Sequence, residues 1–158
     1  MSEAISREPP KQLLLGYGNP GRRDDGLGPA AAARIAQMEW SGVAVVDPYQ
    51  LSIEDALDIT AHDIIWFVDA TRTGPEPFEL RRLAAKETIE FDSHNLDPAT
   101  LLALAMLYFG RAPEAWLLGV RGYEFDFSEG LSQRARANLD LAVALLAHNI
   151  SERMGTPR

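Results

Sequence analysis

The sequence predicts an α/β protein: a single-domain three-layer α/β/α fold around a twisted, mostly parallel sheet of about five strands. Short apolar runs alternate along the chain with segments of helical periodicity, which is typical of βαβ units. The length of 158 residues suits one domain, and an apolar fraction of 46% suits one folded core. No repeat or low-complexity segment divides the chain. We therefore expect one domain over residues 1–158, with frayed ends at 1–10 and 152–158.

The first predicted elements are a strand, a helix and a strand. Gln12–Gly16 is apolar and ends in a glycine-rich turn, so it is predicted to be a buried strand. Pro29–Met38 is predicted to be a helix, because proline suits a first turn and apolar residues recur on one face. A second strand is predicted at Val43–Val46, where Asp47 and Pro48 end the run.

The middle of the chain contains the clearest strand pattern. Ile53–Ile59 is predicted to be a short helix with Ser52 as its N-cap. Ile64–Val68 is a β-branched and aromatic run that ends at Asp69, and it predicts a buried strand. Residues 70–77 contain one glycine and two prolines, so they are expected to form a loop.

Weaker strand patterns come before the next helix. Phe78–Leu83 and Thr88–Phe91 are predicted to be short strands with the character of a sheet edge. Asp97 is predicted to cap a helix that has Pro98 in its first turn, because leucines and an aromatic residue follow at helical spacing.

The last two predicted elements are a strand at Trp116–Val120 and a long amphipathic helix at Ser132–Asn149. The helix repeats apolar residues every three or four positions, which indicates one buried stripe. The stripe consists of Ala135, Leu139, Ala142, Val143 and Leu146.

The composition excludes several classes of function. The chain has no cysteine, which removes disulfides, thiolate metal sites and cysteine nucleophiles. Its formal net charge of −8 argues against nucleic acid, because a nucleic-acid interface needs a basic face. No apolar run approaches the ~20 residues that span a bilayer, and the first ten residues resemble no signal peptide. We therefore expect a cytoplasmic protein that binds neither nucleic acid nor membranes.

Polar side chains gather where the predicted strands end. Asn19, Asp24 and Asp25 follow the first strand, Asp69 follows the third, and His94 follows the last weak strand pattern. In open α/β sheets, ligands lie outside the carboxyl ends of the strands. Carboxylates and an imidazole that converge from separate loops suit a borderline divalent metal. Each of these residues alone is equally suited to a turn or a helix cap, so the predicted metal site depends on their combination.

Two patterns in the first turn are typical of other functions. Residues 16–21 match G-x-G-x-x-G, and Asp47 stands where a dinucleotide-binding fold has its ribose carboxylate. In that fold a helix begins inside the glycine turn, whereas residues 22–28 intervene here and add two acidic side chains, so no nucleotide is expected. Residues 18–21 resemble the opening of peptidyl-tRNA hydrolases, but that family's basic, histidine-containing segment is replaced by acidic residues. A peptidyl-tRNA hydrolase-like hydrolase is kept as an alternative.

Four blocks of sequence together resemble the hydrogenase maturation protease family. The first runs from residue 15 to 28, with Gly-x-Gly-Asn followed by an acidic pair and Gly-x-Gly. Val-Asp-Ala at 68–70, Ser-His-Asn-Leu at 93–96 and Gly-Leu-Ser at 130–132 follow in the family's order. The resemblance covers nearly the whole chain. It implies a single α/β domain with a twisted sheet flanked by helices.

The resemblance also implies an activity. Members of this family are hydrolases that act on a peptide bond: they remove the C-terminal extension from the nickel-loaded precursor of a [NiFe] hydrogenase large subunit. It implies Asp25, Asp69 and His94 as ligands of a nickel ion supplied by the substrate, and as the catalytic residues through that metal. Many members have Glu at the position of Asp25, so this side chain is one methylene shorter. A non-enzymatic nickel-binding assembly factor would use the same residues and is a second alternative.

Three further residues are candidates for contact with the substrate: Asn19 and Asp24 in the first turn, and Gln50 after the second predicted strand. The nucleophile stays open, because the chain has no H-E-x-x-H motif and sequence adjacency of Ser93 and His94 does not make a catalytic triad. The metal could polarise a carbonyl, activate water, or act only as a recognition mark.

Overall fold

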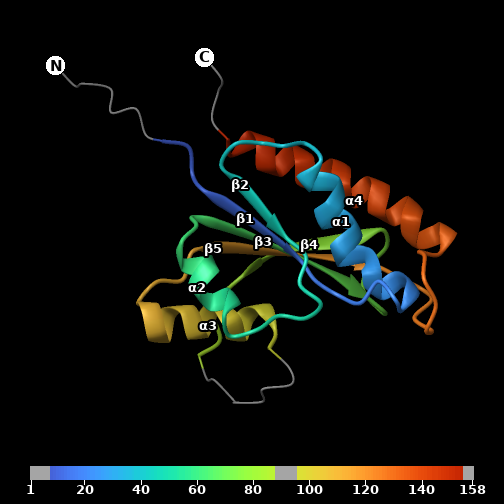
Figure 1. Ribbon diagram of the computed structural model, residues 1–158, viewed down its shortest axis with the longest axis horizontal. Helices are drawn as coiled ribbons and strands as arrows, with labels where there is room; N and C mark the ends of the chain where they lie inside the picture. Colours follow the sequence, from blue (N-terminus) through green and yellow to red (C-terminus); the bar gives the residue numbers. More distant parts are fainter. Residues whose placement is uncertain (1–7, 88–95, 155–158) are drawn as a thin grey trace.

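The structure, a computed structural model that describes residues 8–87 and 96–154, consists of a five-stranded sheet covered on both faces by helices (Figure 1). The strands are β1 (Gln12–Gly16), β2 (Val43–Val46), β3 (Ile64–Thr71), β4 (Phe78–Leu83) and β5 (Glu114–Arg121). The helices are the 3₁₀ turn η1 (Arg23–Gly26), α1 (Leu27–Ala36), α2 (Asp55–Thr60), α3 (Pro98–Phe109) and α4 (Gln133–Glu152). The predicted fold class is confirmed.

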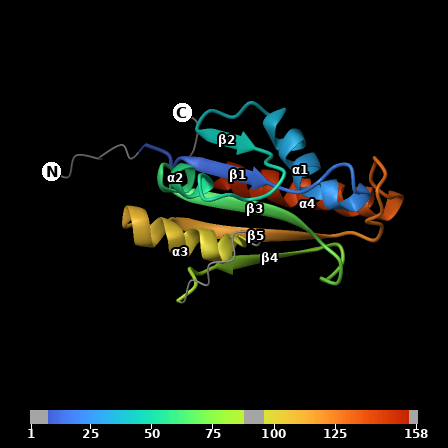
Figure 2. The same cartoon turned by 60° about the horizontal axis from the view of Figure 1, so that its bottom comes forward.

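The strands follow the order β2-β1-β3-β5-β4, which Figure 2 shows from one edge of the sheet to the other. The first four are parallel to their neighbours, and β4 lies antiparallel to β5 at the edge. β1 and β3 occupy the middle of the sheet, with Gln12 opposite Ile64 and Gly16 opposite Val68. The apolar character of both strands follows from this position, because a central parallel strand is buried on both faces.

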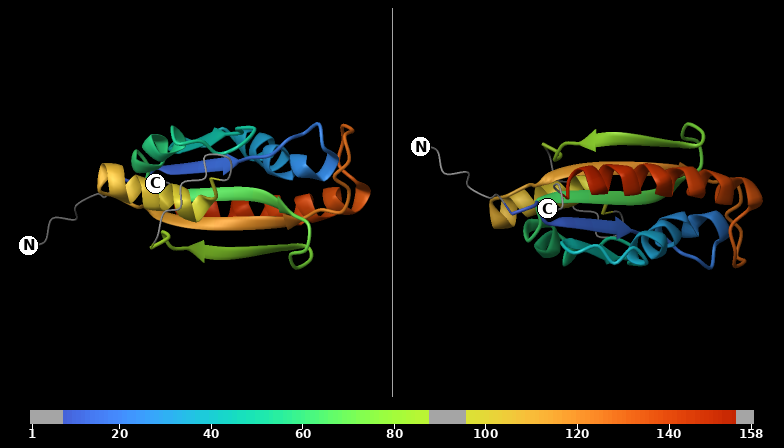
Figure 3. Two further views of the ribbon diagram at one scale, coloured as in Figure 1. Left: turned by 90° about the horizontal axis from the view of Figure 1, so that it is seen from below. Right: turned by 90° about the horizontal axis from the view of Figure 1, so that it is seen from above.

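Two clusters of buried side chains fill the space between the sheet and its helices. α1 and α4 cover one face, where they pack on strand residues such as Leu14 and Trp66. α2 and α3 cover the other face, where they pack on Leu15 and Phe67 (Figure 3). Successive residues of a strand point to opposite faces, so each apolar run supplies both clusters. The predicted stripe of α4 is buried along its whole length: Ala135, Leu139, Ala142, Val143 and Leu146.

The predicted caps of α3 and α4 are confirmed. Asp97 accepts a hydrogen bond from the backbone N–H of Thr100 at 2.7 Å, and Ser132 accepts one from Ala135 at 3.2 Å. The predicted cap of α2 is wrong. Its helix begins at Asp55, whose carboxylate accepts a hydrogen bond from the backbone N–H of Ser52 at 2.7 Å, so the acceptor is the aspartate and not the serine.

Two predicted boundaries change for reasons of tertiary structure. Helix α1 begins at Leu27, two residues before Pro29, because η1 leads directly into it. Strand β3 continues past Asp69 to Thr71, since β5 keeps pairing with it as far as Thr71 opposite Arg121. The loop expected at 70–77 therefore starts later.

Thr88–Phe91, a predicted strand, lies outside the described residues. In the two described ranges, no helix combines the length and apolar character that crossing a membrane would require.

Candidate functional site

The candidate site lies at the carboxyl ends of β1 and β3. The chain leaves β1 through α1 on one face of the sheet and enters β3 from α2 on the other face. In an open α/β sheet, connections that diverge to opposite faces leave a crevice between the two strands where ligands bind. The backbone N–H of Tyr17 donates to the carbonyl of Val68 at 3.2 Å and holds the two strand ends together.

The turn after β1 can be this tight only because glycines form it. Gly18 has φ of +144°, and a Cβ there would lie 2.1 Å from the carbonyl oxygen of Asp25. A Cβ on Gly28 would lie 2.3 Å from the carbonyl oxygen of Tyr17. The glycine pattern therefore brings the backbones of β1, the turn and α1 into direct contact, which is a packing role rather than a phosphate-binding one.

Asp25 is held in place by the turn that contains it. The backbone N–H of Asn19 donates to the Asp25 carboxylate at 2.8 Å, and the Asn19 side-chain oxygen accepts from the N–H of Gly21 at 2.8 Å. One carboxylate oxygen of Asp25 is thus fixed by the backbone, and the half-buried side chain is placed at the end of β1.

Asp69 lies beside Asp25 in an environment that resists its ionisation. Burial raises the pKa of Asp69 to about 6 and the negative charge of Asp25 adds to this shift, although hydrogen bonds from the Tyr17 side chain and the Ala70 N–H oppose it. The Ala70 N–H donates to this carboxylate at 2.8 Å. Two carboxylates that repel each other in a partly desolvated crevice are suited to share a divalent cation.

Tyr17 is the neutral partner of this acidic pair. Burial, followed by the charge of Asp69, raises the pKa of Tyr17 far above its usual value, so its hydroxyl keeps its proton. Tyr17 and Asp69 line a cleft of about 750 Å³ between β4 and the start of α3, whose walls include Arg81, Lys86 and Asp97. Sequence reasoning missed Tyr17, although its position directly after the first predicted strand was the signal.

The structure therefore brings two of the three predicted metal ligands together. His94, the third, lies outside the described residues. Within residues 8–87 and 96–154, no group of three or more His, Cys, Asp or Glu side chains could hold a metal. The donor chemistry of Asp25 and Asp69 fits a divalent ion that brings its other ligands with it.

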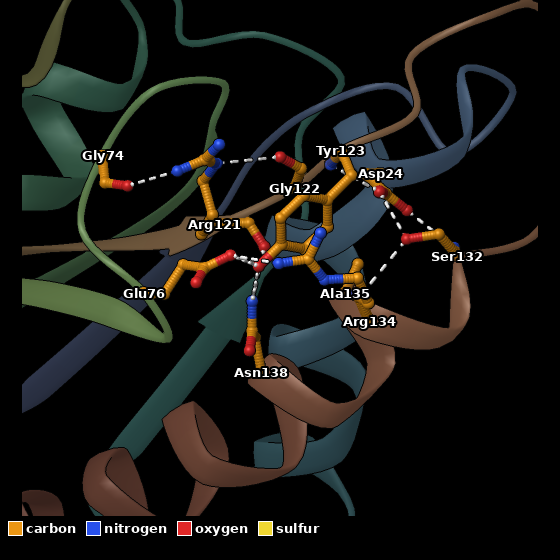
Figure 4. A network of polar contacts seen from close by, with 10 residues as sticks. All are labelled: Asp24, Gly74, Glu76, Arg121, Gly122, Tyr123, Ser132, Arg134, Ala135 and Asn138. Atoms are coloured by element: carbon orange, nitrogen blue, oxygen red, sulfur yellow. Dashed lines mark hydrogen bonds and ion pairs between the residues drawn. The ribbon is translucent and has the colours of Figure 1, made fainter.

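Asp24 has a different position from the one expected for a substrate contact. Its side chain is fully buried (0% exposed) and points toward Ser132, at the start of α4 (Figure 4). The carboxylate accepts hydrogen bonds from the backbone N–H groups of Tyr123 (2.8 Å), Glu124 (3.0 Å) and Ser132 (2.7 Å), and from the Ser132 hydroxyl (2.7 Å). Burial alone would raise the pKa of Asp24, but these hydrogen bonds together hold it below its usual value. The geometry gives Asp24 a structural role and leaves it no oxygen facing a substrate.

The other two candidates for substrate contact lie at the surface. The side-chain amide of Asn19 donates to the hydroxyl of Tyr49, in the loop that follows β2. Gln50 is the next residue of that loop and its side chain is exposed. Both lie on the carboxyl side of the sheet, and their contact with a substrate stays a prediction.

The chain is similar in structure to several solved proteases. The hydrogenase maturating endopeptidase HybD from E. coli superposes with a TM-score of 0.72 over 90% of this chain and 93% of its own, at 22% sequence identity. The [NiFe] hydrogenase maturation protease HycI from Thermococcus kodakarensis KOD1 gives a TM-score of 0.69 over 87% and 90%, at 21% identity. A hydrogenase 2 maturation peptidase from Thaumarchaeota archaeon SCGC_AB-539-E09 gives 0.68 over 89% and 98%, at 23% identity.

These similarities establish the fold and agree with the resemblance seen in the four sequence blocks. In comparisons by sequence, no family model matches the chain, and no curated protein matches it. At this level of identity a shared fold does not by itself assign an activity, because activity depends on the residues of the site.

Proposed function

We propose that this chain is an endopeptidase that removes the C-terminal extension from the precursor of a [NiFe] hydrogenase large subunit. One observation carries the proposal: a fold shared with hydrogenase maturation proteases over about 90% of the chain has two neighbouring carboxylates, Asp25 and Asp69, at its central crevice. The structural similarity supplies the class of reaction, and the crevice supplies side chains with suitable chemistry.

In this proposal the nickel ion belongs to the substrate. Asp25 and Asp69, together with His94, contact the nickel that the precursor already holds and so identify a precursor whose metal centre is complete. The charge supports this role, because a cation relieves the repulsion and the desolvation that raise the pKa of Asp69. Two carboxylates also leave most coordination positions of the ion to the precursor's own ligands.

The surroundings of the two carboxylates support the same reaction. The protonated hydroxyl of Tyr17 orients the Asp69 carboxylate, and the backbone N–H of Asn19 orients that of Asp25. The cleft of about 750 Å³ beside Asp69 is large enough for several residues of an extended polypeptide. The tail near the scissile bond would lie in this cleft, next to the metal.

The test uses a nickel-loaded large-subunit precursor and the same precursor without nickel. Purified enzyme should release the intact tail peptide from the nickel-loaded form only, over many turnovers, as measured by mass spectrometry of both fragments. Asp25→Asn serves as the control that should bind the precursor without cutting it. Stoichiometric nickel transfer without release of a peptide would instead indicate an assembly factor, and the proposal would then be wrong.

A further inference from the structure

The turn that carries Asp25 lies between two other segments of the chain. On one side, the N–H of Gly18 donates to the carbonyl of Pro48 at 3.3 Å, which ties the turn to the loop after β2. On the other side, Arg22 forms a parallel bridge with Ser128, and the N–H of Arg23 donates to the Ser128 carbonyl at 2.8 Å. The loops after β2 and β5 therefore border the turn on its two sides.

Each bordering loop presents a large aromatic side chain to the surface. Tyr49 is 65% exposed and Phe127 is 83% exposed, the highest exposure among the large apolar side chains of the described chain. A single exposed aromatic residue is ordinary on a protein surface, but two that border the same short turn form a local feature. Both face the solvent from the edge of the sheet at which the proposed active site lies.

Neighbouring polar groups hold these aromatic side chains in place. The hydroxyl of Tyr49 accepts a hydrogen bond from the side chain of Asn19, and the guanidinium of Arg22 lies 4.7 Å from the centre of the Phe127 ring. Two residues before Phe127 in the same loop, the ring of Phe125 has the guanidinium of Arg72 4.1 Å from its centre. A side chain that is already ordered loses little rotamer entropy on binding, so these contacts prepare the surface for a partner.

We propose that Tyr49, Phe125 and Phe127, with Arg22 and Arg72, form a docking surface for the folded body of the large-subunit precursor. We call these five residues the aromatic rim. The inference rests on the proposed function and adds a second, separate contact to it: the crevice receives the metal, the neighbouring cleft receives the tail, and the rim holds the protein that presents them. The rim lies around the crevice and not within it, so a group bound inside the crevice would not cover it. We therefore expect its partner to be the surface of a folded polypeptide.

Three features of the rim fit a protein partner. It is continuous with the proposed active site through Asn19 and Arg22, so a protein that places its nickel at Asp25 must cover it. Its composition of Tyr, Phe and Arg is that of the central part of protein interfaces. Its two arginines lie close to exposed acidic residues of the loop after β5, such as Asp126 and Glu129, so the rim offers charges of both signs to polar groups on a partner.

The test measures binding and cleavage separately, with the nickel-loaded precursor as the probe. Tyr49→Ala and Phe127→Ala should each raise the Kd of the precursor, and with it KM, at least about ten-fold, while kcat stays within about two-fold. Tyr108→Ala and Phe109→Ala are matched controls. These residues are 60% and 48% exposed in the last turn of α3. That helix ends beside the amino ends of the parallel strands, far from the rim, so their replacement should change neither constant (Figure 2).

The result that would overturn the inference is a Kd for the Tyr49 and Phe127 variants equal to that of the two controls. Binding is measured without cleavage, so this result stands whether or not the enzyme cuts the precursor. Failure of the proposed function looks different: wild-type protein would then leave the nickel-loaded precursor uncut. Unchanged melting curves of all four variants are expected, because none of the four side chains is buried.

Discussion

Ser132 donates both its hydroxyl and its backbone N–H to the carboxylate of Asp24, and each hydrogen bond is 2.7 Å long. Ser132 is also the N-cap of α4, the longest helix of the described structure (Figure 4). One buried carboxylate therefore connects the first turn of this helix to the turn that carries Asp25. The negative charge lies at the positive end of the helix dipole, where it is stabilised.

Replacement of Asp24 by asparagine should destabilise the protein. The new side-chain amide would turn a donor toward backbone N–H groups that need an acceptor, and leaving such buried groups unpaired costs about 1–3 kcal/mol each. We expect a loss of about 3 kcal/mol or more, which corresponds to a fall in Tm of roughly 6–12 °C. Thermal unfolding followed by circular dichroism measures it. A melting curve like that of the wild type would show that the network is dispensable.

Asp25→Asn is the matched substitution at the neighbouring residue, and it should affect processing and not stability. The asparagine oxygen can still accept the hydrogen bond from Asn19, so the loss of stability should stay within about 1 kcal/mol. The charge that a divalent cation favours is lost, and we expect nearly all processing of the nickel-loaded precursor to disappear. Asp25→Glu keeps the charge and should keep measurable processing. Normal processing by the Asn variant would remove Asp25 from the list of proposed nickel ligands.

The stability of the protein without metal should depend on pH through Asp69. Its pKa rises from 3.8 to about 6 on folding, mainly because of burial, so ionisation is harder in the folded state than in the unfolded state. The resulting destabilisation is absent below about pH 4, appears as the pH rises toward 6, and reaches its full size above that, on the order of 3 kcal/mol.

Asp69→Asn removes this dependence. In the presence of a chelator, the variant should melt roughly 6–12 °C higher than wild type at pH 7.5 and within about 2 °C of it at pH 4. Differential scanning calorimetry at both pH values makes the comparison. An equal gain at both pH values would mean that ionisation of Asp69 is not the cause. Processing by the same variant should be lost at either pH, because a proposed nickel ligand is missing.

Alanine substitutions at two glycines with positive φ distinguish two effects. One is the displacement of the turn after β1, and the other is the general cost of a positive φ for a residue with a Cβ. Gly18→Ala would place a Cβ 2.1 Å from the carbonyl oxygen of Asp25, so the turn must move and processing should fall by at least about ten-fold. Gly42→Ala has a similarly unfavourable φ of +81° but nothing within 4 Å of its Cβ. It should lose about 1 kcal/mol of stability and no activity. Equal processing rates for the two variants would contradict the positioning role of the turn.

Most of the fold could be predicted from local patterns. The strands at Gln12–Gly16 and Val43–Val46 have the predicted bounds, because each is a short apolar run closed by turn residues. The caps at Asp97 and Ser132 are local as well, since each acceptor binds a backbone N–H three residues ahead. The bounds of β3 depended on its partner strand β5, and no pattern within β3 itself shows where that pairing stops.

The sequence by itself determined which edge of the sheet carries the candidate site, because apolar strands ending in Asp25's turn and at Asp69 place both residues at the carboxyl edge. The pattern of residues did not distinguish Asp24 from Asp25, two identical neighbours in one acidic turn: only the family resemblance assigned Asp25 to the metal, and Asp24 was expected to contact the substrate. That choice belongs to the tertiary structure: the donors that bind Asp24 come from residues 123–132, about 100 positions away in the chain. Because the packing of α4 and the loop after β5 brings those N–H groups to one side of the turn, Asp24 is buried there and Asp25 is left beside Asp69.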